Sequence, residues 1–226
     1  MRLKEKFQRL FKKRSNIDKY DNYYHESGHA IIAYMFPDVF DFNYVTLNKR
    51  FCLIHDPLSK GGLHGKPIKT VANLTLIDHD KLALISLAGL CADDINNLNG
   101  IFTKRYNKKK LWNEFSTNPR YQGDFMFFQS EFSYIKNLIK IDQETYVSIS
   151  VKFLNAIMRN DIVWDTINSF RFALMNSIIR TLNITMINMI ISQGKYNKWA
   201  HRNLGNIKKK RSKTIMQYIL KKTVEL

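Results

Sequence analysis

Two histidines and a glutamate lie within five consecutive residues near the beginning of the chain, in the segment His25-Glu26-Ser27-Gly28-His29. Side chains four residues apart project from the same face of an α-helix, so His25 and His29 can bind one metal ion between them. Glu26 cannot bind that ion, but it can reach a water molecule beside it. The pattern predicts a zinc site that activates water, with Glu26 as general base. The alternative is a chance pair of surface histidines around a solvated glutamate.

The local sequence predicts that this motif lies in the middle of a helix. Asp21 is a good N-cap residue, the apolar segment Ala30-Ile31-Ile32-Ala33 follows the motif, and Pro37 ends the pattern. Helix interiors normally avoid glycine, so Gly28 indicates that another element packs closely on the motif.

The rest of the chain is predicted to be mainly helical, with one small β element. Residues 44–47 and 51–54 are β-prone and are followed by turn-forming residues, which indicates a hairpin or small sheet. Apolar spacing predicts a central helix at 82–96, and residues 103–123 have the composition of an exposed loop. Everything beyond that loop is predicted to be helical, in segments at 125–139, 145–158, 164–191 with breaks, and 212–222.

The motifs, taken in order, resemble those of the peptidase domain of FtsH-type proteases, which are membrane-anchored metallopeptidases linked to an AAA ATPase. The histidine segment resembles the family's His-Glu-Ala-Gly-His-Ala helix, and Gly61-Gly62-Leu63 resembles its Gly-Gly-Val strand. The segment Leu87-Ala88-Gly89-Leu90-Cys91-Ala92-Asp93-Asp94 resembles its Ala-Gly-Arg-Ala-Ala-Glu-Glu helix. Gly123-Asp124-Phe125 falls where the family has an Asn-Asp-Leu that contains the third metal ligand. The resemblance covers about residues 20–160.

The resemblance implies a zinc-dependent endopeptidase. Its implied site residues are the zinc ligands His25, His29 and Asp124, the general base and acid Glu26, and the substrate-pairing edge strand Gly61, Gly62 and Leu63. Asp124 is preferred as third ligand because it opens a helix after a loop, and a carboxylate is an acceptable zinc ligand. Asp93 and Asp94 are the alternatives, and Asp124 could instead only cap its helix.

The chain lacks the phosphate-binding loop of the family's ATPase, because Gly65-Lys66 is followed by Pro67. We therefore expect no ATP-driven unfolding within this chain. The expected substrates are peptides and flexible or unfolded polypeptides, unless a separate ATPase presents them.

The composition is strongly basic, with 36 Lys and Arg against 19 Asp and Glu, a net charge of +17. Such a charge favours an anionic membrane surface, an acidic partner or nucleic acid, although lysine enrichment of a genome would give the same balance. No nucleic-acid-binding motif is recognisable. The basic segments 2–14 and 208–213 are predicted to tether the protein to an anionic surface or acidic partner.

The sequence predicts a cytoplasmic protein that associates at most peripherally with a membrane. It has no secretory signal, no apolar stretch long enough to span a bilayer, and only two cysteines, Cys52 and Cys91, which are expected to be reduced and buried. Of the other histidines, His55 and His64 are expected either to line a substrate groove or to lie on a loop surface. His79 is expected in a solvated turn, and His201 at the surface.

The fold class predicted is mainly α: a helical zinc-peptidase domain with a small β hairpin or sheet beside the active-site helix, plus a helical C-terminal extension. The expected boundaries are a basic segment at 1–19, the peptidase domain at 20–160 and the extension at 161–226. Two other functions stay open. One is a catalytically inactive, metallopeptidase-like interaction protein, and the other is a basic nucleic-acid-binding module.

Overall fold

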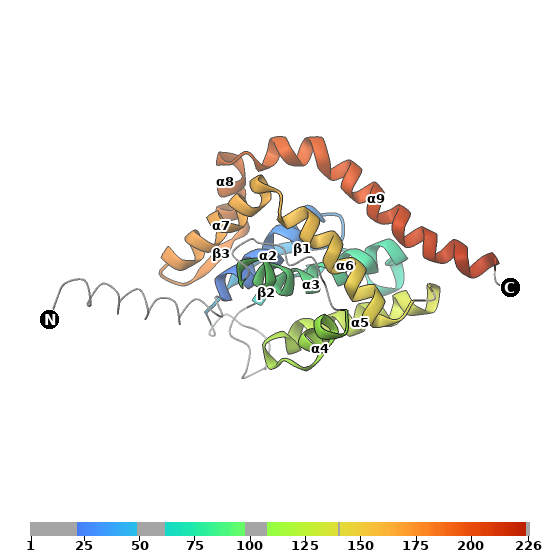
Figure 1. The fold of residues 1–226 in the computed structure, drawn as a ribbon. Coiled ribbons are helices and arrows are strands. Elements are labelled where there is room, and N and C mark those ends of the chain that lie inside the picture. The colour runs from blue at the N-terminus through green and yellow to red at the C-terminus, as the bar shows by residue number, and fades with distance from the viewer. Residues whose placement is uncertain (1–21, 49–61, 98–107, 140, 225–226) are drawn as a thin grey trace.

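The computed structural model describes residues 22–48, 62–97, 108–139 and 141–224 (Figure 1). The predictions for residues 2–14, Asp21, 51–54, His55 and Gly61 lie outside these ranges. The described elements are, in chain order, α2 (Asn22–Met35), β1 (Phe40–Thr46), β2 (Gly62–Pro67), η2 (Val71–Asn73), α3 (Leu76–Asn97), α4 (Lys108–Thr117), η3 (Pro119–Tyr121), α5 (Gln122–Leu138), α6 (Gln143–Met158), α7 (Asp161–Asn176), β3 (Thr181–Asn183), α8 (Ile184–Gln193) and α9 (Tyr196–Val224).

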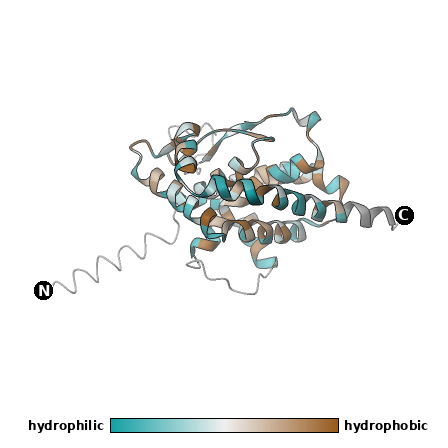
Figure 2. Ribbon diagram, turned by 90° about the horizontal axis from the view of Figure 1, so that it is seen from above, coloured by the Kyte–Doolittle hydropathy of each residue, from teal (hydrophilic) through white to brown (hydrophobic). Residues whose placement is uncertain are grey.

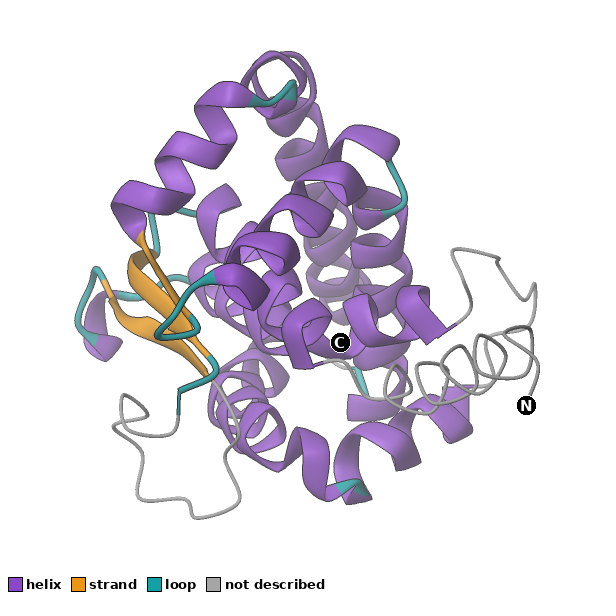
Figure 3. Ribbon diagram, turned by 90° about the vertical axis from the view of Figure 1, so that its left-hand side faces the viewer, coloured by secondary structure: helices purple, strands orange, loops and turns teal. Residues whose placement is uncertain are grey.

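The predicted architecture, mainly helical with a small β element, is confirmed. The described strands form one antiparallel sheet in the order β2-β1-β3, in which β1 pairs with both neighbours. Figure 3 shows the sheet on one side of the helices. Among the described residues, no helix is both long and apolar enough to cross a bilayer.

Two predictions about secondary structure are wrong. The segment 103–123 was expected to be an exposed loop, but it contains α4, because Leu111 and Phe115 lie four residues apart and both pack into the core. Lysines and asparagines around these two residues hide the spacing in the sequence. The region after 123 was expected to be entirely helical, yet β3 interrupts it and pairs with β1. A three-residue strand has almost no pattern of its own.

The central helix α3 begins earlier than predicted, and this overturns the expectation of a solvated turn around His79. Thr75 and Asp78 cap the helix reciprocally: the Thr75 backbone N–H donates to Asp78 Oδ2 at 3.0 Å, and the Asp78 N–H donates to Thr75 Oγ1 at 3.2 Å. His79 is therefore in the first turn of α3, where it is buried and lies 2.7 Å from Glu131 Oε2.

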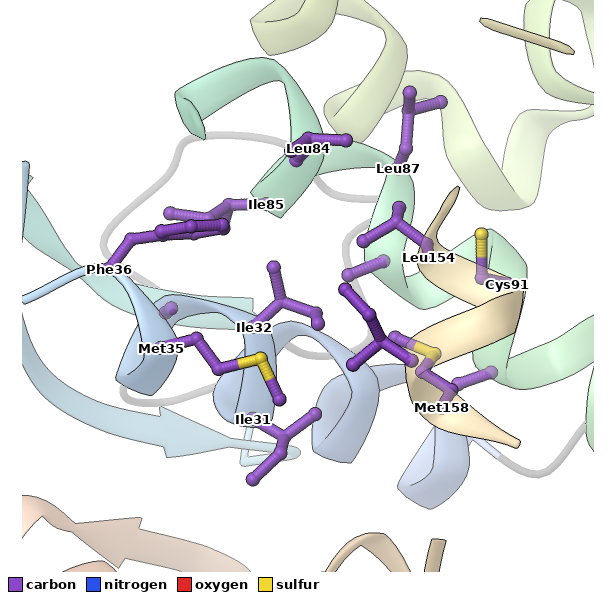
Figure 4. Close-up of a cluster of buried hydrophobic side chains, with 14 of the residues drawn as sticks. Ile31, Ile32, Met35, Phe36, Leu84, Ile85, Leu87, Cys91, Leu154 and Met158 are labelled. Atoms are coloured by element: carbon purple, nitrogen blue, oxygen red, sulfur yellow. The ribbon is translucent and has the colours of Figure 1, made fainter. Parts of the chain in front are cut away.

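The core is centred on α2 and α3. Figure 4 shows apolar side chains of these two helices meeting side chains from α6. The close approach predicted at Gly28 is present, since a Cβ atom there would lie 2.6 Å from Ala92 Cβ and 2.8 Å from the Ala88 carbonyl oxygen of α3.

The segment after residue 160 packs against the same core. Helix α7 lies against α2, and residues from α7, α8 and α9 belong to the same cluster of buried apolar side chains. Arg211 of α9 is buried and donates two hydrogen bonds to Asp80, from Nε at 2.9 Å and from an Nη atom at 2.6 Å. Arg211, which the sequence placed in the basic segment 208–213, therefore has a buried partner on α3 that the local sequence does not show.

Candidate metal centre

Three side chains from two helices converge on one point. His25 and His29 project from the same face of α2, and Asp124 lies in the first turn of α5. The two Nε2 atoms are 3.1 Å apart, and they lie 3.1 and 3.2 Å from Asp124 Oδ2 and Oδ1, respectively. One potential ligand atom from each residue lies within 4.8 Å of the other two. This is the spacing of groups that can share one small cation.

The partners of the other ring nitrogens fix the tautomers of both histidines. His29 Nδ1 lies 2.7 Å from the carbonyl oxygen of Ile85, which can only accept, so Nδ1 carries the proton. His25 Nδ1 lies 3.0 Å from Asp93 Oδ2 and likewise donates to it. In the neutral rings, both Nε2 atoms consequently present lone pairs toward each other and toward Asp124.

These atoms form a cluster of acceptors that lacks a donor. The buried Oδ2 atom of Asp124 faces the His25 Nε2 atom at 3.1 Å, and with both rings neutral it has no donor among the described residues. Acceptors that face one another in a buried site repel unless a cation lies between them, and that cation is either a metal ion or added protons on the imidazole rings. Two histidine nitrogens and a carboxylate are also the donor set that zinc accepts. The residues present thus fit a zinc ion.

The same geometry shifts the pKa values of the cluster. Burial alone would lower the pKa of His25, but the carboxylates of Asp93 and Asp124 outweigh it and raise this pKa well above its ordinary value. Burial acts in the same direction on His29, and Asp124 again reverses it and raises the pKa. Burial would raise the pKa of Asp124, yet the two histidines hold it well below its usual range. The site therefore attracts positive charge.

Asp93 supports the cluster from the other side of His25 rather than joining it. It accepts hydrogen bonds from Arg120 Nε at 2.8 Å, from an Arg120 Nη atom at 2.9 Å and from the Tyr121 hydroxyl at 3.2 Å. The structure brings Asp124 together with the two histidines, and neither Asp93 nor Asp94 belongs to that group. Asp124 is also not the N-cap of α5, which is Tyr121.

Glu26 lies on the same helix turn as His25 and is buried. Its Oε2 atom has no hydrogen-bond partner among the described residues. Burial raises the pKa of Glu26 to about 6, against the opposing influence of His25 and His29. A carboxylate with such a pKa accepts a proton readily near neutral pH and can release it again.

Sequence reasoning missed the groups that hold the site in shape. A Cβ atom at Gly89 would lie 2.4 Å from both His25 Cε1 and His29 Nε2, so only glycine leaves room for the two rings. Gly89 belonged to the segment that resembles the family, but its spatial role had no local signal. Arg120 and Tyr121 gave no signal, because their partner Asp93 is more than 25 residues away.

Two of the residues predicted to bind substrate lie in an edge strand. Gly62 and Leu63 belong to β2, where they pair with Thr46 and Val45 of β1. No described strand pairs with the other side of β2. His64 stacks on Tyr44 with ring centroids 4.4 Å apart, and burial lowers the pKa of His64.

Comparison with known proteins gives no family for this chain: no protein-family model and no curated protein matches it. The assignment of a function therefore depends on the residues and geometry described above.

Proposed function

We propose that this protein is a zinc-dependent endopeptidase, with His25, His29 and Asp124 as zinc ligands and Glu26 as general base. The observation that carries the proposal is the convergence of two buried histidines and the half-buried Asp124, beside a buried glutamate whose Oε2 atom has no described partner. Two histidines and a carboxylate leave a coordination position open, which is typical of catalytic rather than structural zinc sites.

The chemistry divides between the metal and Glu26. Zinc bound by these residues would polarise the scissile carbonyl and lower the pKa of water toward neutrality. Glu26 accepts the proton of the attacking water, because its carboxylate has a pKa of about 6 and is largely ionised at neutral pH. It then donates that proton to the departing amine, which completes cleavage of the peptide bond.

Asp93 and the Ile85 carbonyl orient the two histidines in this scheme. Each accepts a hydrogen bond from an Nδ1 atom and so directs the Nε2 lone pair toward the metal position. Arg120 holds Asp93 in turn. The imidazoles are therefore preorganised for coordination.

The substrate in this proposal is an extended peptide or an unfolded polypeptide. The edge of β2 that faces away from β1 offers backbone N–H and C=O groups to an extended chain. Gly62 and Leu63 belong to this strand. Folded proteins do not expose such extended segments, so a separate ATPase would have to unfold them before cleavage.

The decisive experiment compares Glu26→Gln with wild-type protein loaded with zinc, using unfolded, fluorescently labelled casein as substrate. The amide keeps the size of the side chain but cannot accept the proton, so zinc content should stay the same while hydrolysis falls by several hundredfold. Glu131→Gln is the matched control. Glu131 is also buried beside a histidine, His79, but it lies about 10 Å beyond Asp124 along α5 and therefore outside the proposed site.

The proposal fails if Glu26→Gln and wild type cleave casein equally, or if zinc-loaded wild type cleaves none. Zinc binding without cleavage would instead support an interaction protein that keeps the metal site without its activity.

A further inference from the structure

A surface turn outside the candidate metal centre carries two solvent-exposed isoleucines. Residues 177–180 connect α7 to β3, and Ile178 and Ile179 at its tip are 101% and 50% exposed. The turn lies at the left edge of the described chain in Figure 1 and is coloured as hydrophobic in Figure 2. The adjoining helices α7 and α8 add further exposed apolar side chains, namely Phe172, Met175, Met186 and Met189.

This turn has a defined backbone conformation. The Arg180 N–H donates to the Ser177 carbonyl oxygen at 2.9 Å, which closes the turn, and the Arg180 carbonyl accepts from the Leu47 N–H at 2.8 Å, which attaches it to the sheet. Arg180 adopts a φ of 49°, a conformation that costs a residue with a side chain about 1 kcal/mol. Turns normally place glycine, asparagine, aspartate or serine at such tips. Here a fixed backbone instead presents two large aliphatic side chains.

The stretch of sequence that contains the turn carries positive charge only. Residues 166–224 contain no aspartate or glutamate, and their basic residues are Arg171, Arg180 and those from Lys195 onward. Arg180, Lys195, Lys198 and Arg202 are all exposed. An exposed apolar tip in a basic segment without acidic residues is complementary to an anionic bilayer, whose interior is apolar and whose headgroups are negatively charged.

We infer that the 177–180 turn is a membrane-docking site that inserts Ile178 and Ile179 into the interfacial region of an anionic bilayer, while the exposed Arg180 of the same turn contacts the headgroups. Aliphatic side chains gain free energy when they leave water for hydrocarbon, whereas nucleic acid offers phosphates, sugars and bases that they cannot use. The docking site does not depend on the proposed peptidase activity.

The test is co-sedimentation of the full chain with vesicles of phosphatidylcholine and phosphatidylserine, and with vesicles of phosphatidylcholine alone. Ile178→Asn/Ile179→Asn should weaken partitioning onto the anionic vesicles by about 10- to 100-fold, since each isoleucine contributes up to about tenfold when it is buried. Ile68→Asn is the matched control, because Ile68 is 52% exposed beside β2, and it should bind like wild type. Equal urea midpoints for the three proteins would show that folding is unchanged.

A second measurement reports the depth of the turn. In Ile178→Trp the added indole should shift its fluorescence to shorter wavelength with anionic vesicles, and in Ile68→Trp it should not. The inference is overturned if the double asparagine variant binds anionic vesicles like wild type, or if Ile178→Trp shows no shift. It is also overturned if the double variant changes only self-association or nucleic-acid binding, because the turn would then be an interface for another macromolecule.

Discussion

Arg120 donates two parallel hydrogen bonds to the carboxylate of Asp93, from Nε to Oδ2 at 2.8 Å and from an Nη atom to Oδ1 at 2.9 Å. The same Oδ2 atom lies 3.0 Å from His25 Nδ1. A planar guanidinium fixes both oxygens of the carboxylate and therefore the plane that His25 faces. Arg120 precedes α5, which carries Asp124, so one side chain links the helices that provide the candidate ligands.

Replacing Arg120 should weaken zinc binding without removing a ligand. We expect Arg120→Gln to reduce zinc affinity by about 10- to 100-fold, as for other groups that orient a metal-binding histidine, and Arg120→Lys to restore only part of the loss. Competition with a chromogenic chelator measures the affinity, and Arg202→Gln on the surface of α9 is the control. Unchanged affinity in Arg120→Gln would mean that Asp93 needs no support.

Asp124 and Asp93 should differ in their effects on zinc. Asp124→Ala removes a ligand from the proposed site and should lower zinc affinity more than Asp93→Asn does, because Asp93 only orients His25. Asp94→Asn should have the smallest effect of the three. The ranking is measured by zinc content after dialysis against graded chelator concentrations. If Asp93→Asn loses more zinc than Asp124→Ala, the assignment of the third ligand is wrong.

Zinc affinity should fall as the pH is lowered, beginning above the ordinary histidine range. The pKa values of His25 and His29 are raised above 6.5 in the absence of metal, so protons occupy the Nε2 positions at higher pH than in an isolated histidine. Zinc must displace these protons, and its apparent affinity therefore rises with pH until both rings are neutral. Calorimetric titration between about pH 6 and pH 8 should show proton release on binding. Affinity that is constant over that range would contradict the protonated metal-free state.

Gly89→Ala should disrupt the site although it adds a single methyl group. That group would lie 2.4 Å from atoms of both His25 and His29, so at least one ring must move. We expect loss of zinc binding, measured as in the chelator assay. Gly123→Ala is a stringent control, since a Cβ there meets nothing within 4 Å even though Asp124 is its neighbour. Normal zinc binding by Gly89→Ala would show that the rings adapt.

Arg211→Met should destabilise the whole protein. Its loss leaves the carboxylate of Asp80 buried without a charge partner, which typically costs about 3 to 5 kcal/mol in free energy of unfolding. Lys210→Met, at an exposed neighbouring position on α9, should change stability by less than about 0.5 kcal/mol. Urea denaturation followed by circular dichroism compares the two. Equal midpoints would show that the Tyr146 hydroxyl, 2.6 Å from Asp80 Oδ1, is a sufficient partner.

The features that could be predicted are those whose signals lie in neighbouring residues of the sequence. The helix around His25 and His29 was predictable because its apolar stripe and the Pro37 stop lie within about one helix length of the motif. The mainly helical class followed from apolar spacing in the same way. Helix α4 was missed because only two apolar positions, Leu111 and Phe115, define its buried face among many polar residues.

The groups that support the candidate site could not be predicted, because each depends on a distant partner. His79 was expected in solvent, but Glu131 gives it a buried partner 52 positions away. Asp93 was considered only as a ligand, since nothing near it in the sequence indicates Arg120. Charge along the chain shows where ionic groups are, but only the packing of helices shows which of them meet.

The pairing of Asp80 with Arg211 also bears on synthesis of the protein. A ribosome produces Asp80 131 positions before Arg211, after it has already made both histidines of the motif and before it makes the rest of the core. During that interval the aspartate of α3 lacks its cationic partner, and burial of its charge is costly. The nascent chain therefore carries the complete histidine and aspartate set well before the central helix can be buried at full stability. Until α9 has been synthesised, the chain is therefore more prone to misfolding and aggregation than the completed protein is.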